Sequence, residues 1–255
     1  MQPVACEARD AYETFAPLYD LFTAGHDYEG WTAHLERALL DHGLQGRDVL
    51  DVACGTGKSF LPFLRRGYRV TACDLSPRMV AIARAKARDA VLFVADARRL
   101  PKVGQFDLVM CLDDSLNYLL DTAGLEAAVA GMRRNLRPDG LCLFDLNTLR
   151  AYRTTFADTF EVEAGGVAFT WHGNGHASAT SGCSASALIE TSLGPDSASV
   201  HEQRHFSPSV VRAALAKAGL EAAGIYGQLP DGSLSTEPDE LVHLKLVYVA
   251  RPQGR

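Results

Sequence analysis

The chain begins with helical periodicity. An aromatic stripe with the spacing of one helix face is formed by Tyr12, Phe15, Tyr19 and Phe22. A second helical segment is expected over residues 28–41, ending near Gly43. We therefore predict a helical cap over residues 1–44.

From residue 45 the pattern changes to short apolar runs separated by helical segments. The runs, expected to be strands, cover residues 48–52, 69–74, 91–94, 106–111 and 141–147, and the helical segments cover 58–66, 77–88 and 122–136. Ser76-Pro77 and Ser207-Pro208 each place an N-cap residue before proline at the first helical position. Alternating strands and helices predict a parallel sheet covered on both faces, in the α/β class.

Turn residues mark the later boundaries. Arg137-Pro138-Asp139-Gly140 predicts a turn, because proline presets one backbone dihedral and glycine accepts a positive φ. Glycine-rich turns then separate runs over 167–172, 187–193 and 198–206, a pattern typical of antiparallel strands. A helix over 208–218 and strands over 220–226 and 241–250 follow. We predict a single domain with an α/β core (45–150), a β insertion (151–206) that forms a small lid, and a closing helix and strands (207–255).

The junction after the first predicted strand is rich in glycine. Gly55 and Gly57 allow the backbone to turn tightly and approach a ligand, and the following helix offers free N–H groups. A phosphate-binding loop, G-x-x-x-x-G-K-S, would need glycine at Val52, and the dinucleotide fingerprint G-x-G-x-x-G would need glycine at Phe60. Both phosphate-binding motifs are therefore disfavoured.

The remaining pattern is Asp-x-x-x-Gly-x-Gly, with Asp51 inside the strand. An acid there repels phosphate and suits a ligand that carries an ammonium group. The segment resembles motif I of the class I S-adenosylmethionine-dependent methyltransferases. Four further markers of that family follow in order: Asp74, Ala95-Asp96-Ala97, residues 106–111 and residues 136–140. The resemblance covers about residues 45–150 and the closing strands, and implies a Rossmann-like, doubly wound sheet of seven strands, mostly parallel with the last antiparallel.

The resemblance implies S-adenosyl-L-methionine as cofactor and S-adenosyl-L-homocysteine as product. The family's contacts to the methionine part fall on Asp51, Ala53, Gly55 and Gly57, with a backbone carbonyl from Leu112 for the ammonium group. The contacts to ribose and adenine fall on Asp74, Leu75, Met79, Asp96 and Ala97. Each acid has the alternative interpretation of an ordinary strand-end or turn residue.

A methyl acceptor is expected at the carboxyl ends of the strands, where open α/β sheets bind their ligands. The aromatic cap segment either only packs on the sheet, or also forms a lid in which the Tyr12 and Tyr19 hydroxyls face the reacting centre, with Tyr19 beside the cofactor too. The other candidate acceptor contacts are Asp114, Asn117, Tyr118, Trp171 and His172. No catalytic residue is assigned.

Two histidine pairs have a spacing that suggests metal ligands. They are His172 with His176 and His201 with His205. On a strand, residues four apart lie about 13 Å from each other, too far to share an ion. We expect no metal site, and we expect these histidines to need only a hydrogen-bond partner.

Composition narrows the possible partners and compartment. The chain of 255 residues has 25 Lys and Arg against 31 Asp and Glu, a net charge of −6, which disfavours nucleic acid as a partner. No apolar run approaches the roughly 18 residues that span a bilayer, and the N-terminal stretch does not have the pattern of a secretory signal. The six cysteines form no C-x-x-C pair. We expect a cytoplasmic protein with no membrane partner and leave the oligomeric state open.

The sequence therefore predicts direct transfer of a methyl group to a small-molecule acceptor. Within the family it resembles bacterial small-molecule methyltransferases, several of which methylate amines of sugars or antibiotic precursors. A neutral amine is already nucleophilic, whereas an alcohol needs a base. This favours N-methylation. The alternatives are an O-methyltransferase and a module that binds S-adenosylmethionine without catalysis.

Overall fold

The computed structural model describes residues 8–254, so residues 1–7 of the predicted cap and Arg255 lie outside the described residues. The aromatic stripe forms α1 (Ala8–Phe22), and the second predicted helix is α2 (Tyr28–Asp41). Asp27 caps α2, because its side chain accepts a hydrogen bond from the Gly30 N–H. Within residues 8–254, no helix is both long and apolar enough to cross a bilayer.

The main sheet confirms the predicted α/β class. Its strands are β1 (Asp48–Val52), β2 (Arg69–Asp74), β3 (Val91–Val94), β4 (Phe106–Cys111), β5 (Leu136–Asn147), β10 (Leu220–Gln228), β11 (Leu234–Ser235) and β12 (Lys245–Pro252). Their order is β11-β10-β12-β5-β4-β1-β2-β3. β1 to β5 pair in parallel, whereas β12 is antiparallel to both β5 and β10. The two-residue edge strand β11, which the sequence analysis did not predict, makes the sheet eight-stranded.

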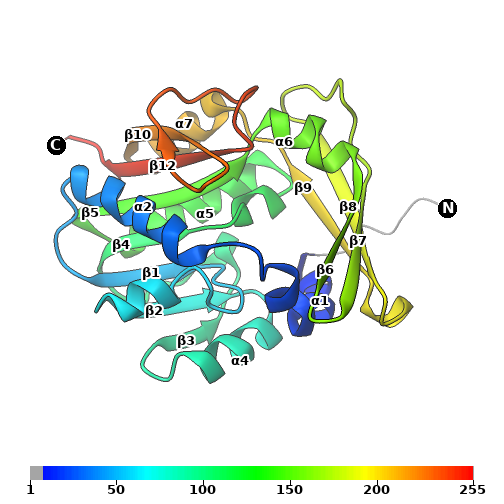
Figure 1. The fold of residues 1–255 in the computed structure, drawn as a ribbon. Helices are drawn as coiled ribbons and strands as arrows, with labels where there is room; N and C mark the ends of the chain where they lie inside the picture. The colour runs from blue at the N-terminus through cyan, green and yellow to red at the C-terminus, as the bar shows by residue number, and fades with distance from the viewer. Residues whose placement is uncertain (1–7, 255) are drawn as a thin grey trace.

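Helices cover both faces of the main sheet (Figure 1). They are α3 (Leu61–Arg65), α4 (Pro77–Lys86), α5 (Thr122–Asn135) and α7 (Pro208–Lys217), together with α2. Strand residues alternate between the faces. Val49 packs in the cluster with α2 and α3, while Leu50 and Val52 pack in the cluster with α5 and α7. The near-continuous apolar strands are therefore explained by burial on both sides.

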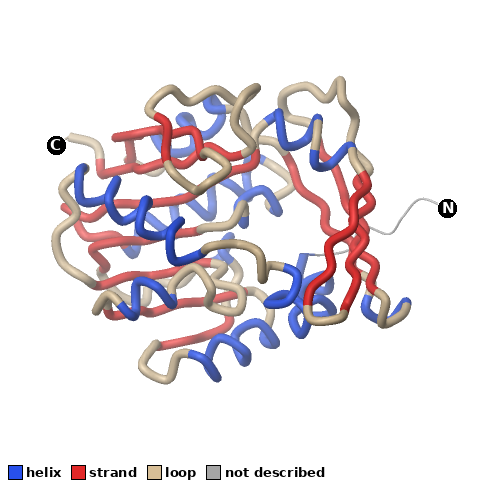
Figure 2. The backbone as a smooth tube through the Cα atoms, in the orientation of Figure 1, coloured by secondary structure: helices blue, strands red, loops and turns tan. Residues whose placement is uncertain are grey.

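The predicted insertion forms a separate antiparallel sheet (Figure 2). After the short helix α6 (Leu149–Arg153) come β6 (Thr159–Ala164), β7 (Val167–Gly173), β8 (Ser184–Thr191) and β9 (Ser199–Arg204). The first of these, β6, was not predicted. Phe169 of β7 packs against Phe15 of α1, with ring centroids 6.4 Å apart. The insertion and the N-terminal helix therefore support each other at one end of the main sheet (Figure 1).

The structure corrects the predicted turn at Arg137–Gly140. This segment lies within β5, and Gly140 does not have a positive φ. Glycine is required there for a different reason: a Cβ atom would lie 2.8 Å from the Asp107 carbonyl oxygen and 2.9 Å from that of Phe106. Arg137 holds the extended segment against β4 through an ion pair with Asp107.

We expect Gly140→Ala to destabilise the protein by about 1 to 3 kcal/mol, the usual cost of forcing extra volume into a packed site. The free energy of unfolding, measured by urea denaturation, tests this. Gly25→Ala is the control, because a Cβ atom there would meet nothing within 4 Å. Equal stability of the two variants would contradict the close-approach explanation.

Candidate functional site

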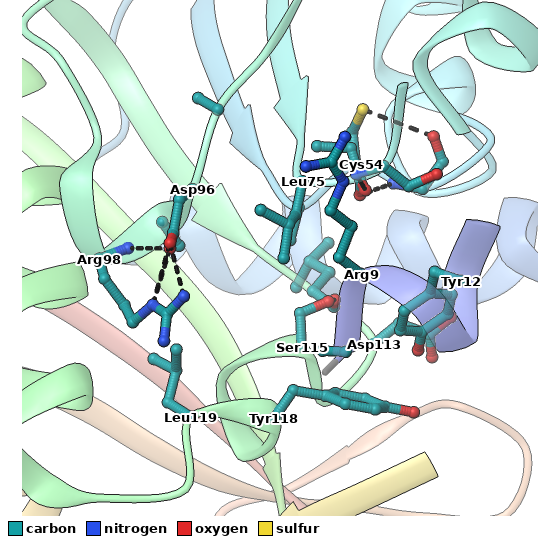
Figure 3. Close-up of a pocket in the computed structure, with 18 of the residues that line it drawn as sticks. Arg9, Tyr12, Cys54, Leu75, Asp96, Arg98, Asp113, Ser115, Tyr118 and Leu119 are labelled. Atoms are coloured by element: carbon teal, nitrogen blue, oxygen red, sulfur yellow. Dashed lines mark hydrogen bonds and ion pairs between the residues drawn. The ribbon is translucent and has the colours of Figure 1, made fainter. Parts of the chain in front are cut away.

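A pocket lies along the carboxyl ends of β1 to β4. The residues that follow these strands line it: Ala53, Leu75, Ala95 and Leu112. Helix α1 contributes Arg9, Tyr12 and Tyr19, and the 3-10 helix η2 (Ser115–Tyr118) contributes its first and last residues (Figure 3). The pocket thus lies where an open α/β sheet binds ligands.

The glycine loop after β1 has a left-handed backbone at three positions. The φ angles are 61° at Ala53, 53° at Gly55 and 91° at Gly57. At Gly57 a side chain would also be blocked, because a Cβ atom would lie 2.8 Å from the Phe60 ring. Ala53 and Gly55 line the pocket, so the loop brings its backbone next to a ligand.

Asp74 links this loop to the end of β2. Its carboxylate accepts hydrogen bonds from the backbone N–H groups of Gly55 (2.8 Å) and Ser76 (2.9 Å). Burial outweighs these bonds and raises the pKa of Asp74 to about 6. The Leu75 backbone N–H also contributes, and three donors leave part of the carboxylate's acceptor capacity for a ligand hydroxyl.

Asp51 is fully buried beneath the pocket. One carboxylate oxygen accepts a hydrogen bond from Ser59 (2.9 Å), and the other, Oδ1, has no partner among the described residues. Burial raises the pKa of Asp51 to about 8. Ser59 lines the pocket and Asp51 itself does not. An unsatisfied buried oxygen next to a ligand pocket is the feature a cationic ligand would satisfy.

Asp96 lies at the other end of the pocket, bound to Arg98 (Figure 3). It accepts hydrogen bonds from the Arg98 backbone N–H and guanidinium at 2.7 to 3.0 Å. Partial burial raises the pKa of Asp96, but these bonds outweigh it and the net shift is downward. The carboxylate is therefore ionised and held in place.

The loop after β4 carries two consecutive aspartates in the left-handed region. The φ angles of Asp113 and Asp114 are 63° and 51°. Their backbone N–H groups donate to the Asp145 carboxylate at 2.7 and 2.9 Å. Lys245 contacts all three carboxylates, at 3.0 Å (Asp113), 2.6 Å (Asp114) and 3.1 Å (Asp145). We refer to these four residues as the carboxylate–lysine cluster.

Two tyrosines join this cluster to the pocket. Tyr19 and Tyr28 both donate to Asp113 Oδ2, at 3.1 and 2.6 Å. Burial raises the pKa of Asp113, but Lys245 and Tyr28 outweigh it and hold the pKa well below its usual range. Burial, despite Lys245, raises the pKa of Asp114 to about 6. The Asp113 end of the cluster therefore presents an ionised carboxylate to the pocket.

Helix α1 is attached to both loops of the pocket. Glu13 accepts hydrogen bonds from the Ser76 hydroxyl (2.6 Å) and the Arg78 backbone N–H (3.0 Å). Asp20 accepts one from Thr56 in the glycine loop (2.6 Å) and forms an ion pair with Lys86. These contacts hold α1 over the pocket, which is the position expected for a lid.

The structure places most of the predicted cofactor residues in the pocket wall. Those that line it are Tyr19, Ala53, Gly55, Asp74, Leu75, Asp96, Ala97 and Leu112. Asp51, Gly57 and Met79 do not line it. Asp51 lies below the loop, Gly57 faces Phe60, and Met79 is completely buried at the start of α4.

The predicted acceptor residues divide differently. Tyr12 and Tyr118 line the pocket. Asp114 does not line it, but belongs to the carboxylate–lysine cluster, whose Asp113 does. Buried Asn117 braces the loop instead, donating to the Arg204 carbonyl oxygen at 2.9 Å and accepting from the Asn147 N–H.

Trp171 and His172 lie away from the pocket, contrary to the prediction. The indole N–H of Trp171 donates to the Thr155 carbonyl oxygen, and its ring stacks on Phe160. His172 Nε2 lies 2.9 Å from a Glu190 carboxylate oxygen on β8, and the His172 side chain is 40% exposed. The alternation of apolar and polar residues along β7 did not show which face of this strand is turned toward the pocket.

Sequence reasoning missed Tyr28, Asp113 and Glu202, which all line the pocket. Tyr28 belongs to the aromatic-rich N-terminal segment, and Asp113 is adjacent to a predicted residue, so both could have been proposed. Glu202 is on β9, and no pattern in the chain linked that strand to the pocket.

Comparisons with known proteins agree with this geometry. Residues 49–140 match the family model of a methyltransferase domain. The chain is 34% identical over 132 residues to the dTDP-3-amino-3,6-dideoxy-alpha-D-glucopyranose N,N-dimethyltransferase of Streptomyces fradiae, an alignment covering 51% of this chain and 52% of that protein. For two bacterial relatives at 35% and 33% identity, from Geobacillus sp. (strain WCH70) and Bacillus subtilis (strain 168), the chain covers 62% and 65% of their length, less than two thirds.

Solved structures extend the likeness over the whole described fold. An S-adenosylmethionine-dependent methyltransferase from Clostridium acetobutylicum has a TM-score of 0.78 at 23% identity, covering 95% of this chain and 99% of its own. DesVI from Streptomyces venezuelae has a TM-score of 0.72 at 25% identity, covering 93% and 98%. The predicted resemblance to S-adenosylmethionine-dependent methyltransferases and their fold are thus confirmed.

We expect Lys245→Met to destabilise the protein by about 3 to 5 kcal/mol at pH 8, because it leaves buried carboxylates without a counter-charge. Without Lys245 the pKa of Asp113 in the folded state rises above its unfolded value, and a raised carboxyl pKa favours folding at low pH. The loss should therefore shrink as the pH falls from 8 to 5. Urea denaturation at several pH values measures it.

Lys217→Met is the matched control. Lys217 forms an exposed ion pair with Glu126, so its removal should change stability by less than about 1 kcal/mol at every pH. If Lys245→Met lost no more stability than Lys217→Met at any pH, Lys245 would not balance the charges of the cluster.

Proposed function

We propose that this protein transfers the methyl group of S-adenosylmethionine to an amine nitrogen of a small molecule. One observation carries the proposal: a single pocket joins the glycine loop and Asp74 to an end lined by tyrosines over the carboxylate–lysine cluster. The first part suits the cofactor, and the second suits a nitrogen that becomes positively charged.

The cofactor fits the residues present. The positive charge of the cofactor's ammonium group would stabilise the charged form of Asp51, which lies below the pocket, and Asp74 keeps acceptor capacity for a ribose hydroxyl. Asp96, held by Arg98, would contact the adenine edge. When bound, S-adenosylmethionine supplies an electrophilic methyl group on a sulfonium.

The electrostatics of the acceptor end favour nitrogen. In N-methylation the positive charge passes from sulfur to the acceptor nitrogen, so negative groups near the acceptor stabilise the charge that develops. The three carboxylates of the cluster outnumber the nearby lysines, Lys245 and Lys58. Asp113, which accepts hydrogen bonds from the Tyr19 and Tyr28 hydroxyls, itself lines the pocket and brings negative charge to its wall.

An alcohol acceptor is less well supported. Its hydroxyl would need a general base at the reacting centre. None of the described residues that line the pocket is a histidine, and the Asp113 carboxylate is already bound by Lys245 and two tyrosines. An O-methyltransferase, and a module that binds the cofactor without catalysis, remain as alternative outcomes of the experiment below.

The relatives support an amino sugar as the acceptor class. The Streptomyces fradiae protein is named for a nucleotide-linked amino sugar, and one solved structure is that of a sugar N-methyltransferase from Streptoalloteichus at 27% identity and a TM-score of 0.71, covering 92% of this chain and 93% of its own. We therefore place the acceptor among the amines of antibiotic-type sugars.

Methyl transfer can be tested directly. With radiolabelled S-adenosylmethionine, we expect transfer to dTDP-3-amino-3,6-dideoxyglucose or to another amine of a panel, and none to the matching 3-hydroxy sugar or to phenols. Transfer only to the hydroxyl compounds would establish the O-methyltransferase. Cofactor binding without transfer to any amine would favour the non-catalytic module.

Asp74→Ala is the control variant for that assay. It should weaken S-adenosylhomocysteine binding by about 1.5 to 3 kcal/mol, the scale of lost charge-assisted hydrogen bonds. Calorimetry measures this, and ATP and NAD should not bind to the wild type. An unchanged dissociation constant would remove Asp74 from the site.

Tyr19→Phe should lower kcat/KM about tenfold or more while changing stability by less than about 1 kcal/mol. The variant keeps the buried ring but loses the hydroxyl that donates to Asp113 across the pocket. Steady-state kinetics and thermal denaturation measure the two effects. A sharp loss of stability with normal turnover per folded molecule would make Tyr19 a packing residue only.

A further inference from the structure

Lys58 is a charged residue of the pocket wall to which the proposed function assigns no contact. It lies in the turn between the glycine loop and α3, and with Gly57 and Ser59 it forms the G-K-S tail of a phosphate-binding motif that is otherwise incomplete. Its side chain is partly buried and lines the pocket. An ammonium group is therefore available to a ligand directly after the glycine loop.

The end of helix α1 holds this ammonium group in place. Lys58 Nζ donates to the carbonyl oxygen and to the hydroxyl oxygen of Thr23, each at 2.8 Å. It also lies 4.9 Å from the centroid of the Tyr28 ring. Thr23 follows the last residue of α1, and its hydroxyl donates to the Tyr19 carbonyl oxygen. An ammonium group has three N–H donors, so the two bonds to Thr23 leave one for a ligand.

The positive charge of Lys58 has no carboxylate partner in the part of the chain that the structure describes. The two acids whose charges act on it are engaged elsewhere, Asp20 in an ion pair with Lys86 and Asp113 in one with Lys245. Burial lowers the pKa of Lys58 by more than these acids raise it. A ligand carboxylate would supply the missing negative charge.

The residue next to Lys58 contacts an acid. Ser59 lines the pocket beside Lys58 and donates to the Asp51 carboxylate at 2.9 Å. Two consecutive residues thus place a positive group and a negative group at the same part of the pocket. This arrangement is complementary to an α-amino acid, which carries an ammonium group and a carboxylate on one carbon. A phosphate would instead meet Asp51 and Asp74 without bringing a positive charge.

We propose that Lys58 binds the carboxylate at the amino-acid end of S-adenosylmethionine, through the N–H that Thr23 leaves free. The inference rests on the proposed function and adds a specificity-determining residue to the cofactor half of the pocket. Because the same ammonium group also binds Thr23, the residue that receives the carboxylate also fixes the end of helix α1. A ligand that keeps the adenosine and the sulfur but lacks the carboxylate loses this contact.

The contact can first be tested on the wild-type, full-length protein. Calorimetry compares S-adenosylhomocysteine with its decarboxylated analogue, which keeps the adenosine, the thioether sulfur and the ammonium group. We expect the analogue to bind about tenfold more weakly or worse, the scale of one lost charge-assisted hydrogen bond. Equal dissociation constants would overturn the inference and leave the proposed function standing. Binding of neither ligand would refute both.

The variant Lys58→Met assigns the preference to the lysine, because methionine keeps an unbranched side chain without the charge. It should weaken binding of S-adenosylhomocysteine about tenfold and binding of the decarboxylated analogue less than about twofold. Lys58→Arg, which restores a positive charge, should bind S-adenosylhomocysteine more tightly than Lys58→Met does. Equal weakening of both ligands by Lys58→Met would mean that the lysine only supports helix α1, and the inference would be wrong.

Lys86→Met is the matched control for the general effect of one positive charge. Lys86 forms an ion pair with Asp20 and does not line the pocket, so its removal should leave the preference for S-adenosylhomocysteine over the analogue unchanged. A carboxylate of the acceptor is the other possible partner of Lys58, and no acceptor is present in these titrations. Normal binding of S-adenosylhomocysteine by Lys58→Met, with a raised KM for glycine but not for ethanolamine, would assign the lysine to the acceptor and overturn the inference.

Discussion

The end of the pocket that we propose for the acceptor depends on the ammonium group of Lys245. The antiparallel pairing of β12 with β5 brings this residue beside Asp145, whose carboxylate accepts the backbone N–H groups of Asp113 and Asp114. Two successive non-glycine residues in the left-handed region cost about 1 to 3 kcal/mol each. The hydrogen bonds from these backbone N–H groups to Asp145 offset that cost. Lys245 in turn balances the three carboxylates, which would otherwise repel one another in a buried space. The last strand of the chain thus determines the shape of a loop that precedes it by more than a hundred residues.

The acidic residues beside the glycine loop disfavour phosphate, the ligand that such loops usually bind. Helix N-termini after glycine loops attract phosphate, but here Asp51 and Asp74 lie beside the loop. Burial raises the pKa of both, to about 8 and 6, which means that each carboxylate is under-compensated in the protein alone. A ligand that brings an ammonium group or hydroxyl donors relieves that cost, whereas a phosphate would increase it.

Most of the main sheet could be predicted from the sequence because its signals are local. The strand at residues 48–52 and the helix at 28–41 have the bounds that the apolar pattern indicated, and Asp74 follows directly from its place at a strand end. What could not be predicted depends on contacts between distant segments. The residues around Gly140 have the composition of a turn, yet glycine is needed there because two carbonyl oxygens of β4 leave no room for a Cβ atom. The orientation of Trp171 and His172 depended on which face of β7 meets α1, and alternation alone does not decide that.

The contrast between local signals and contacts of distant segments also distinguishes the two halves of the site. The cofactor half comes from consecutive strand ends of one sheet, so its residues appear in order along the chain. The half that we propose for the acceptor is assembled from α1, η2 and β9, which are far apart in sequence. The insertion contributes to it twice: Phe169 packs against Phe15 of the helix that carries Tyr12 and Tyr19, and the His201 ring lies within hydrogen-bond distance of the Tyr118 hydroxyl. Because neither contact involves the glycine loop, substitutions in the insertion can alter the acceptor while the cofactor half keeps its geometry. A fold arranged in this way can change its substrate without changing its chemistry.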